Sequence, residues 1–327
     1  MICELEYNIF NASGSFPANL AMEVFRLQQR ENPVYKAYIE ALAISPESVT
    51  AIHQIPFLPI RFFKSHRVVT GLVEAAIQFE SSGTTGTQPS RHFVKDTGLY
   101  RTSFIKAFEL EYGPIANLAI LGLLPSYLER QHSSLVYMVD ELIQLSGHPS
   151  SGFYLYDHHR LFTTLLDLES SGQPYLLIGV TFALLDFAQE YQLPVKNGMI
   201  METGGMKGRK IELTRKAVHD ALKKAFQVET IHAEYGMTEL LSQAYSRGGG
   251  IFSCPPWMKI LIRDEDDPFL IKTEGRGIIS IIDLANLHSC SFIETEDLGV
   301  LHKNGTFEVE GRVDSSEARG CSMMING

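Results

Sequence analysis

The sequence predicts an α/β protein with mostly parallel sheets packed against helices, plus a smaller β-rich, barrel-like subdomain near the C-terminus. Up to about residue 247, short apolar runs alternate with segments whose apolar residues recur every three or four positions, which is typical of strands connected by helices. From Gly248 onward, short apolar runs are instead separated by turn residues. We expect residues 1–247 to form an α/β core, 248–312 a β-rich subdomain of the same large domain, and 313–327 a hinge-like tail.

The individual elements follow from the periodicity of apolar residues. Leu20, Val24 and Leu27, for example, share one face of a helix, whereas continuous apolar runs favour buried strands. The expected helices occupy residues 15–45 (interrupted at Pro33), 100–112, 135–145, 182–191 and 210–226. The expected strands occupy residues 75–79, 116–124, 175–180, 199–203, 228–232, 259–262, 277–284, 289–295 and 306–309. The proline-pinned segment 55–60 is expected to lie extended across the domain surface.

Composition excludes several classes of protein. The net charge of −10 argues against sequence-independent nucleic-acid binding. No apolar run reaches the roughly 18 residues that a membrane span needs, and the N-terminus lacks the basic start and apolar core of a secretory signal. The four cysteines form no short-spaced pair, so we expect reduced thiols in a cytoplasmic protein.

The loop Ser81–Arg91 is the most informative stretch. Its two glycines and six hydroxyl side chains offer nothing to a core, and it follows the strand expected at Ala75–Phe79. Glycines let backbone N–H groups approach phosphate oxygens, hydroxyls donate as well, and Arg91 adds a fixed charge. No Gly-Lys-Ser/Thr closes the loop, so it is not a Walker A motif. The loop predicts a phosphate-binding site, and the alternative is a polar surface loop.

Four further segments contain residues suited to ligand binding, and the first two follow expected strands, where α/β proteins bind ligands. Gly204–Arg209 combines paired glycines with two cations, although a tight turn would look the same. Glu234–Glu239 offers an aromatic face, a hydroxyl and a carboxylate, or simply caps a helix. Glu296–Gly299 places an acid in a turn that could hold a ribose or be solvated. Gly311–Asp314 suits a hinge or an ordinary surface turn.

These segments, in this order, resemble the adenylate-forming superfamily, which includes acyl-CoA synthetases, firefly luciferase and peptide-synthetase adenylation domains. In that superfamily a Ser-Gly-Thr-Thr-Gly loop, a Tyr-Gly-x-Thr-Glu motif, an Asp-Leu-Gly turn and a Gly-Arg-x-Asp hinge occur in the same succession. Within it, the segments Leu124–Arg130, Gly205–Arg209 and Pro255–Met258 look like those of LuxE-type acyl-protein synthetases, which are related to phenylacetate–CoA ligases. The resemblance extends from the loop to the end of the chain.

The resemblance implies a role for each matched residue. The loop would hold the β- and γ-phosphates of ATP, Tyr235 would flank the adenine, and Thr238 would contact the α-phosphate. Glu239 would ligate Mg²⁺, which binds through one or two carboxylates together with phosphate oxygens. Asp297 would bind the ribose hydroxyls, helped by Arg312. The ATP-binding residues so implied are Ser82, Gly83, Thr84, Thr85, Gly86, Arg91, Gly204, Gly205, Tyr235, Gly236, Asp297 and Arg312.

The chain departs from the superfamily pattern in two places. The loop usually carries a lysine after its proline, whereas Ser90 and Arg91 follow Pro89 here, and arginine holds the charge with a different geometry. The superfamily also has a mobile C-terminal domain of about a hundred residues beyond the hinge, the size of a small domain. Only residues 313–327 follow the hinge here, so we expect that domain and its catalytic lysine to be absent.

The acyl acceptor is therefore the open question. In acyl-protein synthetases the acyl group passes to a cysteine near the C-terminus, and Cys321 next to Arg319 is the candidate here. Its alternative is a small apolar residue in a tail. Cys254, His288 and Cys290 could hold zinc, but their spacing is not diagnostic, and the position of Cys290 in an apolar strand favours buried structural residues.

The predicted function is ATP-dependent activation of a carboxylic acid, expected to be a fatty acid, to acyl-AMP, followed by transfer to a protein thiol. Thr238, Glu239 and Cys321 are the expected catalytic residues, and ATP and Mg²⁺ the expected cofactors. One alternative uses coenzyme A as acceptor. Another is a catalytically silent nucleotide- or acyl-binding subunit of a partner such as an acyl-CoA reductase. The aromatic row of Tyr100, Phe104 and Phe108 belongs either to the core or to an acyl channel.

Overall fold

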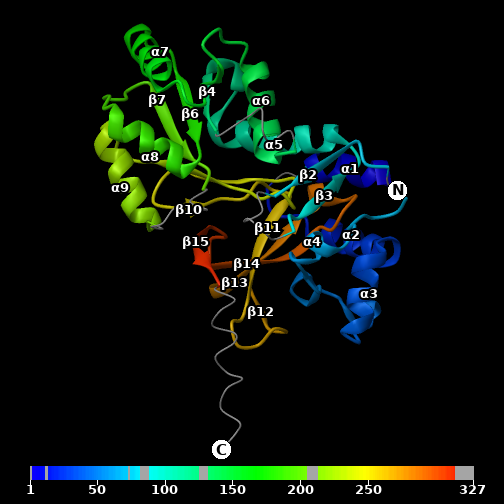
Figure 1. Cartoon of the computed structure of the whole chain (residues 1–327). Coiled ribbons are helices and arrows are strands. Elements are labelled where there is room, and N and C mark those ends of the chain that lie inside the picture. Colours follow the sequence, from blue (N-terminus) through cyan, green and yellow to red (C-terminus); the bar gives the residue numbers. More distant parts are fainter. Residues whose placement is uncertain are drawn as a thin grey trace, which may run out of the picture.

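The computed structural model describes residues 2–11, 14–72, 74–81, 88–124, 132–204 and 213–313 (Figure 1). Its helices are α1 (Ile2–Asn11), α2 (Ala18–Glu31), α3 (Pro33–Ala41), α4 (Phe62–Ser65), α5 (Thr97–Tyr112), α6 (Ser134–Ser146), α7 (His158–Ser171), α8 (Thr181–Glu190) and α9 (Arg215–Phe226). Its strands are β1 (Leu58–Pro59), β2 (Ile77–Glu80), β3 (Arg91–Val94), β4 (Ala119–Leu123), β5 (Gly152–Phe153), β6 (Tyr175–Gly179), β7 (Gly198–Glu202), β8 (His232–Tyr235), β9 (Ala244–Ser246), β10 (Ile251–Phe252), β11 (Met258–Arg263), β12 (Ile271–Lys272), β13 (Gly275–Asp283), β14 (Phe292–Leu301) and β15 (Phe307–Arg312).

The first large sheet has the strand order β5-β4-β6-β7-β8-β9, and all its pairs are parallel except β8–β9. Helices cover both of its faces (Figure 1). Ile120, Leu176 and Ile178 pack on the side of α5 and α6, whereas Leu121 and Leu177 pack against α7, α8 and α9. Because both faces are buried, these strands are continuous apolar runs. The predicted α/β architecture is confirmed.

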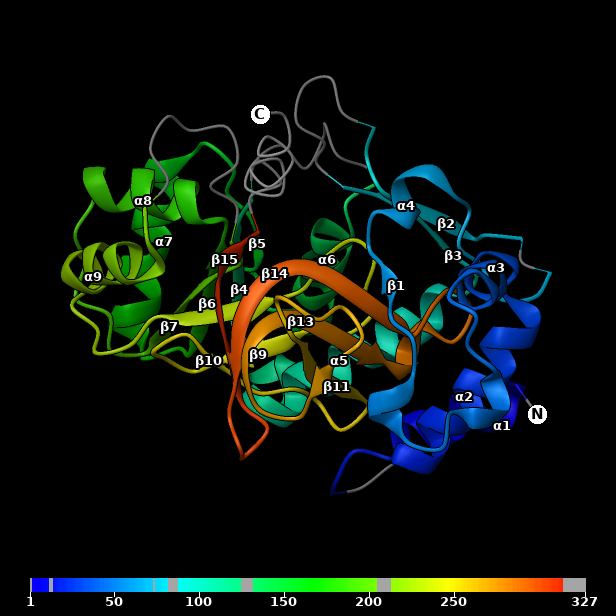
Figure 2. The ribbon, with the colours of Figure 1, turned by 90° about the horizontal axis from the view of Figure 1, so that it is seen from below.

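The second large sheet follows in the chain and is antiparallel, with the order β10-β15-β14-β13-β11-β12. Figure 2 shows β14 and β13 curving together, so that this sheet curls into an open half-barrel. The β14 ladder shifts register near Leu298 and Gly299, where a bulge increases the local bend. The predicted β-rich part is therefore confirmed. Among the described helices, none has the length and apolarity needed to cross a membrane.

The N-terminal helices and the half-barrel share one hydrophobic core. Phe25 of α2 and Tyr35 of α3 pack edge-on and stacked, respectively, against Phe292 of β14. The prediction that segment 55–60 lies across the surface is wrong, because Leu58 is fully buried and β1 pairs in parallel with β14. Its apolar side chains stabilise the fold more when they cover the half-barrel than when they face water.

Several other boundaries differ from the prediction. The helix expected from Lys210 begins at Arg215, because the Thr214 hydroxyl accepts the Ala217 N–H and caps the first turn. The strand expected at 228–232 lies at His232–Tyr235, where pairing with β7 sets its position. The sequence patterns did not predict α1 or α7. The aromatic row of α5 is buried in the core rather than exposed as a channel wall.

The polar loop Ser81–Arg91 connects two antiparallel strands. β2 and β3 pair from Ile77 with Val94 to Glu80 with Arg91, so the segment is the loop of a β-hairpin. The sequence patterns did not predict β3, which Arg91 begins; the helix expected after the loop, α5, starts at Thr97. Residues 82–87 lie outside the described residues.

Gln28 of α2 fixes the helix to the half-barrel by four buried hydrogen bonds, one of which its amide donates to the Ser291 hydroxyl at 3.2 Å. Its amide donates to the carbonyl oxygens of Asn286 and Leu287, at 3.1 and 3.0 Å, and its side-chain oxygen accepts the Ser291 N–H at 2.9 Å. The change Gln28→Leu leaves these groups unpaired, so we expect the free energy of unfolding to fall by about 3 kcal/mol. Urea unfolding measures this. The neighbouring Gln29→Leu is the control, and equal loss in both variants would contradict the prediction.

Candidate active site

Three side chains from three elements meet where β8 ends. Tyr235 is the last residue of β8, Asp297 lies within β14, and Arg312 ends β15. The Tyr235 hydroxyl donates to Asp297 Oδ2 at 2.8 Å, and Arg312 Nε donates to Asp297 Oδ1 at 3.3 Å. The prediction of a turn at Asp297 is wrong, because it is paired with Arg312 across the β14–β15 ladder. The fold therefore orients one carboxylate with a phenol and a guanidinium.

The surroundings of Tyr235 and Asp297 restrict both side chains. The Tyr235 ring packs against Phe252 and Phe307, with centroid separations of 5.9 and 5.5 Å. Burial, and next the neighbouring Asp297 charge, raise the pKa of Tyr235 well above its ordinary value, so its hydroxyl remains a donor. The Asp297 N–H donates to Thr295 Oγ1 at 3.0 Å, and the Thr295 hydroxyl donates to the Ile279 carbonyl oxygen at 2.9 Å. Thr295 therefore ties the backbone of Asp297 on β14 to Ile279 on β13.

The segment that follows Tyr235 contains Thr238 and Glu239 and is fixed through its backbone. His92 Nδ1 donates to the Thr238 carbonyl oxygen at 2.8 Å, and Asn286 Nδ2 donates to the Glu239 carbonyl oxygen at 2.6 Å. Further along, Asp283 accepts the N–H groups of residues 241 and 242 at 2.8 and 3.0 Å. These contacts are made to the backbone carbonyl oxygens of Thr238 and Glu239. They fix the position of the two residues and do not involve the side-chain hydroxyl or carboxyl group.

His92 connects the hairpin to this segment, and the sequence patterns did not single it out. It lies on β3 directly after Arg91, and its ring is fully buried. Burial lowers the pKa of His92 to about 4, which the hydrogen bond to Thr238 opposes, so the imidazole is neutral near pH 7. Its position beside the polar loop was the available signal. Arg91 precedes His92 on β3, and its Nε is buried without a hydrogen-bond partner among the described residues.

Gly236 and Glu234 lie beneath the same segment. A Cβ on Gly236 would lie 2.4 Å from Glu234 Oε1, so the backbone passes closely over that carboxyl group. Burial, together with the Glu202 charge, raises the pKa of Glu234 to about 8. Glu234 is therefore mostly protonated near pH 7, and Glu239, which is 5% exposed, is the other carboxyl group of this segment. Segment 234–239 does not cap a helix, because turns and a strand follow it.

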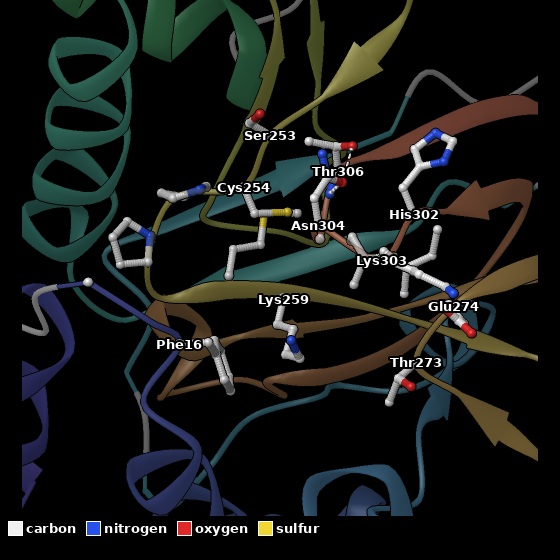
Figure 3. Close-up of a pocket in the computed structure, with 17 residues that line it drawn as sticks. Phe16, Ser253, Cys254, Lys259, Thr273, Glu274, His302, Lys303, Asn304 and Thr306 are labelled. Atoms are coloured by element: carbon white, nitrogen blue, oxygen red, sulfur yellow. Dashed lines mark hydrogen bonds between the residues drawn. The ribbon is translucent and has the colours of Figure 1, made fainter.

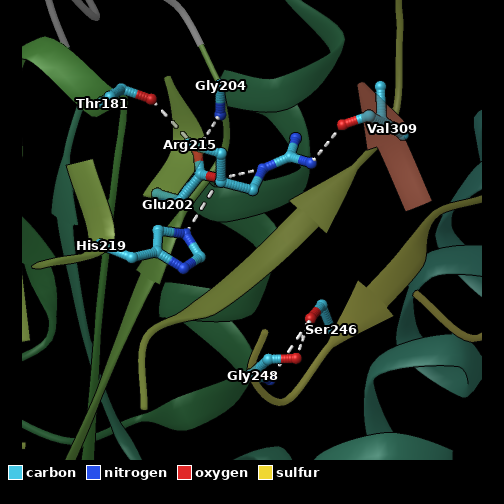
Figure 4. Close-up of polar contacts among 8 residues, drawn as sticks. All are labelled: Thr181, Glu202, Gly204, Arg215, His219, Ser246, Gly248 and Val309. Carbon is cyan, nitrogen blue, oxygen red and sulfur yellow. Dashed lines mark hydrogen bonds and ion pairs between the residues drawn. The ribbon is translucent and has the colours of Figure 1, made fainter. Parts of the chain in front are cut away.

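Gly204 lies just past the end of β7. It adopts φ +68, and its N–H donates to Glu202 Oε2 at 2.7 Å. The Gly204 carbonyl oxygen accepts the Thr181 N–H at 3.0 Å, which ties the turn to the start of α8. Figure 4 shows Glu202 between these groups and the side chains of α9. The positive φ explains a glycine at this position.

The remaining predicted site residues cannot be placed. Ser82, Gly83, Thr84, Thr85, Gly86, Gly205 and Cys321 lie outside the described residues. Of the others, Tyr235, Asp297 and Arg312 are in direct contact, and His92 joins the Thr238 segment to the strand that Arg91 begins. Gly204 lies just past the end of β7, the strand that pairs with β8 in the same sheet.

Cys254, His288 and Cys290, which we considered as zinc ligands, each make separate contacts. His288 Nε2 contacts Glu6 at 2.6 Å, and the Cys290 thiol donates to the Phe292 carbonyl oxygen at 3.4 Å. Within the described residues, no group of three or more His, Cys, Asp or Glu side chains is arranged to hold a metal ion. Cys254 instead lines a separate cavity of about 510 Å³ with Lys259 (Figure 3). None of the predicted site residues lines that cavity.

The arrangement suits a ligand with both hydroxyl and anionic groups. Among the described residues, the hydrogen bonds from Tyr235 and Arg312 use one acceptor position on each Asp297 oxygen, and a carboxylate has about four such positions. Such a carboxylate can accept two hydroxyl donors from a diol. Arg312 is exposed and Arg91 half-buried, so the cations available for anions come from two different elements.

No protein-family model and no curated protein matches the chain. Its structure is similar to solved structures at low sequence identity. One is ATP-bound MatB from Rhodopseudomonas palustris, with TM-score 0.54 and 15% identity over 74% of this chain and 49% of MatB. Another is 2-hydroxyisobutyryl-CoA ligase in the postadenylation state, in complex with R3-HIB-AMP, with TM-score 0.65 and 9% identity over 91% and 68%. A third is the long-chain-fatty-acid-CoA ligase FadD1 from Archaeoglobus fulgidus, with TM-score 0.51 and 13% identity over 73% and 52%.

The chain shares their fold. It spans about half the length of MatB and FadD1 and about two thirds of the 2-hydroxyisobutyryl-CoA ligase. The long alignment to that ligase includes most of both large sheets, because 91% of this chain is covered. The α/β architecture with a half-barrel is therefore found in enzymes whose own names describe ligation of acids to coenzyme A.

The buried His92 predicts a specific dependence of stability on pH. Between pH 6.5 and 4 the unfolded chain binds a proton at this histidine and the folded chain does not, so the free energy of unfolding falls as the pH decreases through this window. The difference amounts to about 3 kcal/mol. The change His92→Asn keeps a donor toward the Thr238 carbonyl oxygen and removes the titration.

Urea unfolding of both proteins at intervals from pH 7 to 4 measures the effect. Asp283, whose burial raises its pKa to about 6, titrates in the same window with the opposite sign but is present in both proteins. It therefore cancels in the difference between them. Exposed His53→Asn is the control. Parallel profiles for wild type and His92→Asn would contradict the assignment of a neutral buried imidazole.

Proposed function

We propose that this chain binds ATP and activates a carboxylic acid by forming acyl-AMP. The observation that carries this proposal is the Tyr235–Asp297–Arg312 contact at the end of β8, next to the Thr238–Glu239 segment. An oriented carboxylate matches the two hydroxyls of a ribose, and the nearby hydroxyl and cations match phosphates. The shared fold with ATP-bound MatB and with a ligase in its postadenylation state supports the proposal.

In the proposed reaction, a carboxylate oxygen of the acid attacks the α-phosphorus of ATP. The bond from that phosphorus to the oxygen bridging to the β-phosphate breaks, and pyrophosphate leaves. The residues of this chain supply binding and charge: Thr238 donates to the α-phosphate, and Arg91 and the polar loop hold the departing phosphates. Asp297 fixes the ribose and thereby aligns the α-phosphorus. Donors placed where negative charge develops lower the barrier.

Magnesium fits the residues present. Mg²⁺ binds through one or two carboxylates together with phosphate oxygens, so it needs no cluster of protein ligands. Glu239 provides a nearly buried carboxylate on a segment whose backbone is fixed by Asn286 and His92. When bound, the ion would neutralise charge on the phosphates. Glu239 is thus the residue that we propose to hold it, as the sequence predicted.

The activation step has a direct test. Labelled pyrophosphate should exchange into ATP only when a suitable acid is present, and fatty acids of graded chain length are the first acids to screen. We expect Asp297→Ala to raise the KM for ATP by 10-fold or more, about the contribution of one charge-assisted hydrogen bond. The exposed Asp267→Ala is the matched control. Absence of exchange with every aliphatic and aromatic acid, with ATP still bound, would support a silent nucleotide-binding subunit instead.

The acceptor of the acyl group is proposed to be a thiol. A thiolate attacks the acyl carbonyl carbon, the bond from that carbon to the phosphate oxygen breaks, and AMP leaves. Two acceptors are compatible with the sequence: Cys321, as the acyl-protein synthetase resemblance implies, and coenzyme A. Two of the structural neighbours carry CoA ligase in their names, which favours coenzyme A as the second candidate.

A labelled acid distinguishes the two acceptors. If Cys321 accepts the acyl group, incubation with ATP gives a protein adduct that hydroxylamine removes and that is lost in Cys321→Ser. Cys254→Ser, at a buried thiol whose pKa burial raises to about 12, is the matched control and should keep the adduct. An adduct that persists in Cys321→Ser would exclude this cysteine. Acyl-CoA formed upon addition of coenzyme A, without a protein adduct, would identify coenzyme A.

A further inference from the structure

We propose that Arg215 is a positioning residue that holds two sides of the candidate active site at a fixed separation. One side is the end of β7 with Gly204, and the other is the strand β15, which ends at Arg312. The inference rests on the proposed function for its kinetic consequences, but its structural content does not depend on it. Figure 4 shows the Arg215 side chain reaching from Glu202 to Val309.

The β7 side of this link is a buried carboxylate. Glu202, the last residue of β7, is 4% exposed. Its Oε2 accepts the Gly204 N–H at 2.7 Å and the Thr181 hydroxyl at 3.0 Å. Its Oε1 accepts Arg215 Nε at 3.3 Å and lies 3.6 Å from His219 Nε2. Both oxygens are therefore engaged, and the Gly204 turn is tied to the same carboxylate as Arg215.

The charge of Glu202 is maintained although it is buried. Burial raises its pKa, but the His219 hydrogen bond, the Arg215 charge and the Gly204 N–H together lower the pKa below the ordinary value. Removing Arg215 would leave a buried carboxylate with less compensation, which is costly. The Glu202–Arg215 pair is therefore expected to contribute more to stability than an ion pair on the surface.

The β15 side of the link is made by the same guanidinium. Arg215 NH1 donates to the Val309 carbonyl oxygen at 2.8 Å, and the guanidinium lies 5.2 Å from the centre of the Phe252 ring. Phe252 in turn packs against Tyr235. Arg215 thus contacts β15 three residues before Arg312 and touches the aromatic ring that supports Tyr235.

The outer part of β15 is held mainly from the side of β14 and β13: Arg276 Nε donates to Glu310 Oε2 at 2.8 Å, and Arg312 Nε donates to Asp297 Oδ1 at 3.3 Å. β10 pairs only with Phe307 and Glu308, so from Val309 to Arg312 the ladder to β14 lies on one side of the strand. Residues 310–313 are exposed. Among the described residues, Arg215 donates the hydrogen bond that this stretch receives from the β7 side. Its loss should therefore loosen the strand that carries Arg312.

The position of Arg215 also runs against a local rule. It is the first residue of α9, after the Thr214 cap, and a cation at a helix N-terminus opposes the helix dipole. Local conflicts of this kind concentrate where tertiary structure or function requires them. The contacts to Glu202 and Val309 supply that requirement here, because a guanidinium can donate to both at once.

The test compares wild type, Arg215→Met, Arg215→Lys and Arg101→Met. Arg101 forms an ion pair with Glu141 at 2.7 Å between α5 and α6, so it controls for loss of an arginine pair away from the site. For Arg215→Met we expect the KM for ATP in pyrophosphate exchange to rise about 10-fold with kcat within about twofold. Arg215→Lys should recover only part of the loss, because an ammonium cannot bridge both acceptors in the same geometry.

Hydrogen–deuterium exchange gives a readout that needs no activity. Peptides covering 307–312 should lose protection in Arg215→Met and keep it in Arg101→Met. Unchanged protection and unchanged KM would overturn the inference, whatever the wild-type activity. If wild type shows no exchange with any acid, the proposed function fails while the protection measurement still decides the link. Should Arg215→Met not fold, Glu202→Gln, which keeps the side-chain shape and removes the charge, gives the same comparison.

Discussion

The hydrogen bond from Tyr235 to Asp297 is the contact on which the candidate site depends, because it joins the two large sheets at one point. Tyr235 ends β8, the strand next to the edge strand β9 of the mostly parallel sheet, and Asp297 belongs to the curled antiparallel sheet. A buried phenol and carboxylate remain paired because either would be costly to leave unpaired. The same hydrogen bond therefore constrains both the relative position of the two sheets and the orientation of the Asp297 carboxylate.

Buried polar side chains, each with its own partners, surround this junction. Asp283 accepts backbone N–H groups of the segment after Tyr235, and Asn286 donates to the Glu239 carbonyl oxygen. His92 approaches the same segment from the hairpin. Such contacts specify a backbone path that apolar packing alone would leave loose. The segment that contains Thr238 and Glu239 is thus positioned by residues from other parts of the chain. Its fixed backbone sets the direction in which the two side chains leave the chain.

Much of the fold was readable from local pattern. The runs 175–180 and 199–203 correspond to strands buried on both faces. Such strands consist of consecutive apolar residues, so they can be recognised without knowing which strands pair with them. The predictions were wrong where contacts with distant segments determine an element's bounds or burial. The bounds of β8 follow from pairing with β7, and Leu58 is buried because β1 joins β14, far away in sequence. The helix at 158–171 was missed although its apolar residues, such as Leu161, Leu165 and Leu168, share one face.

The sequence by itself determined the chemical inventory: the hydroxyl- and glycine-rich loop, the Tyr-Gly-Met-Thr-Glu segment, Asp297 and Arg312, together with the alternation of strands and helices. These are properties of residue type and short-range spacing. Only the tertiary structure decided that Asp297 belongs to a strand opposite Arg312, that His92 holds the Thr238 backbone, and that Arg215 spans from Glu202 to β15. Each of these contacts joins residues from different strands or helices. The reason is physical: strand register and side-chain hydrogen bonds between distant segments are fixed by packing the whole chain, and no local pattern encodes them.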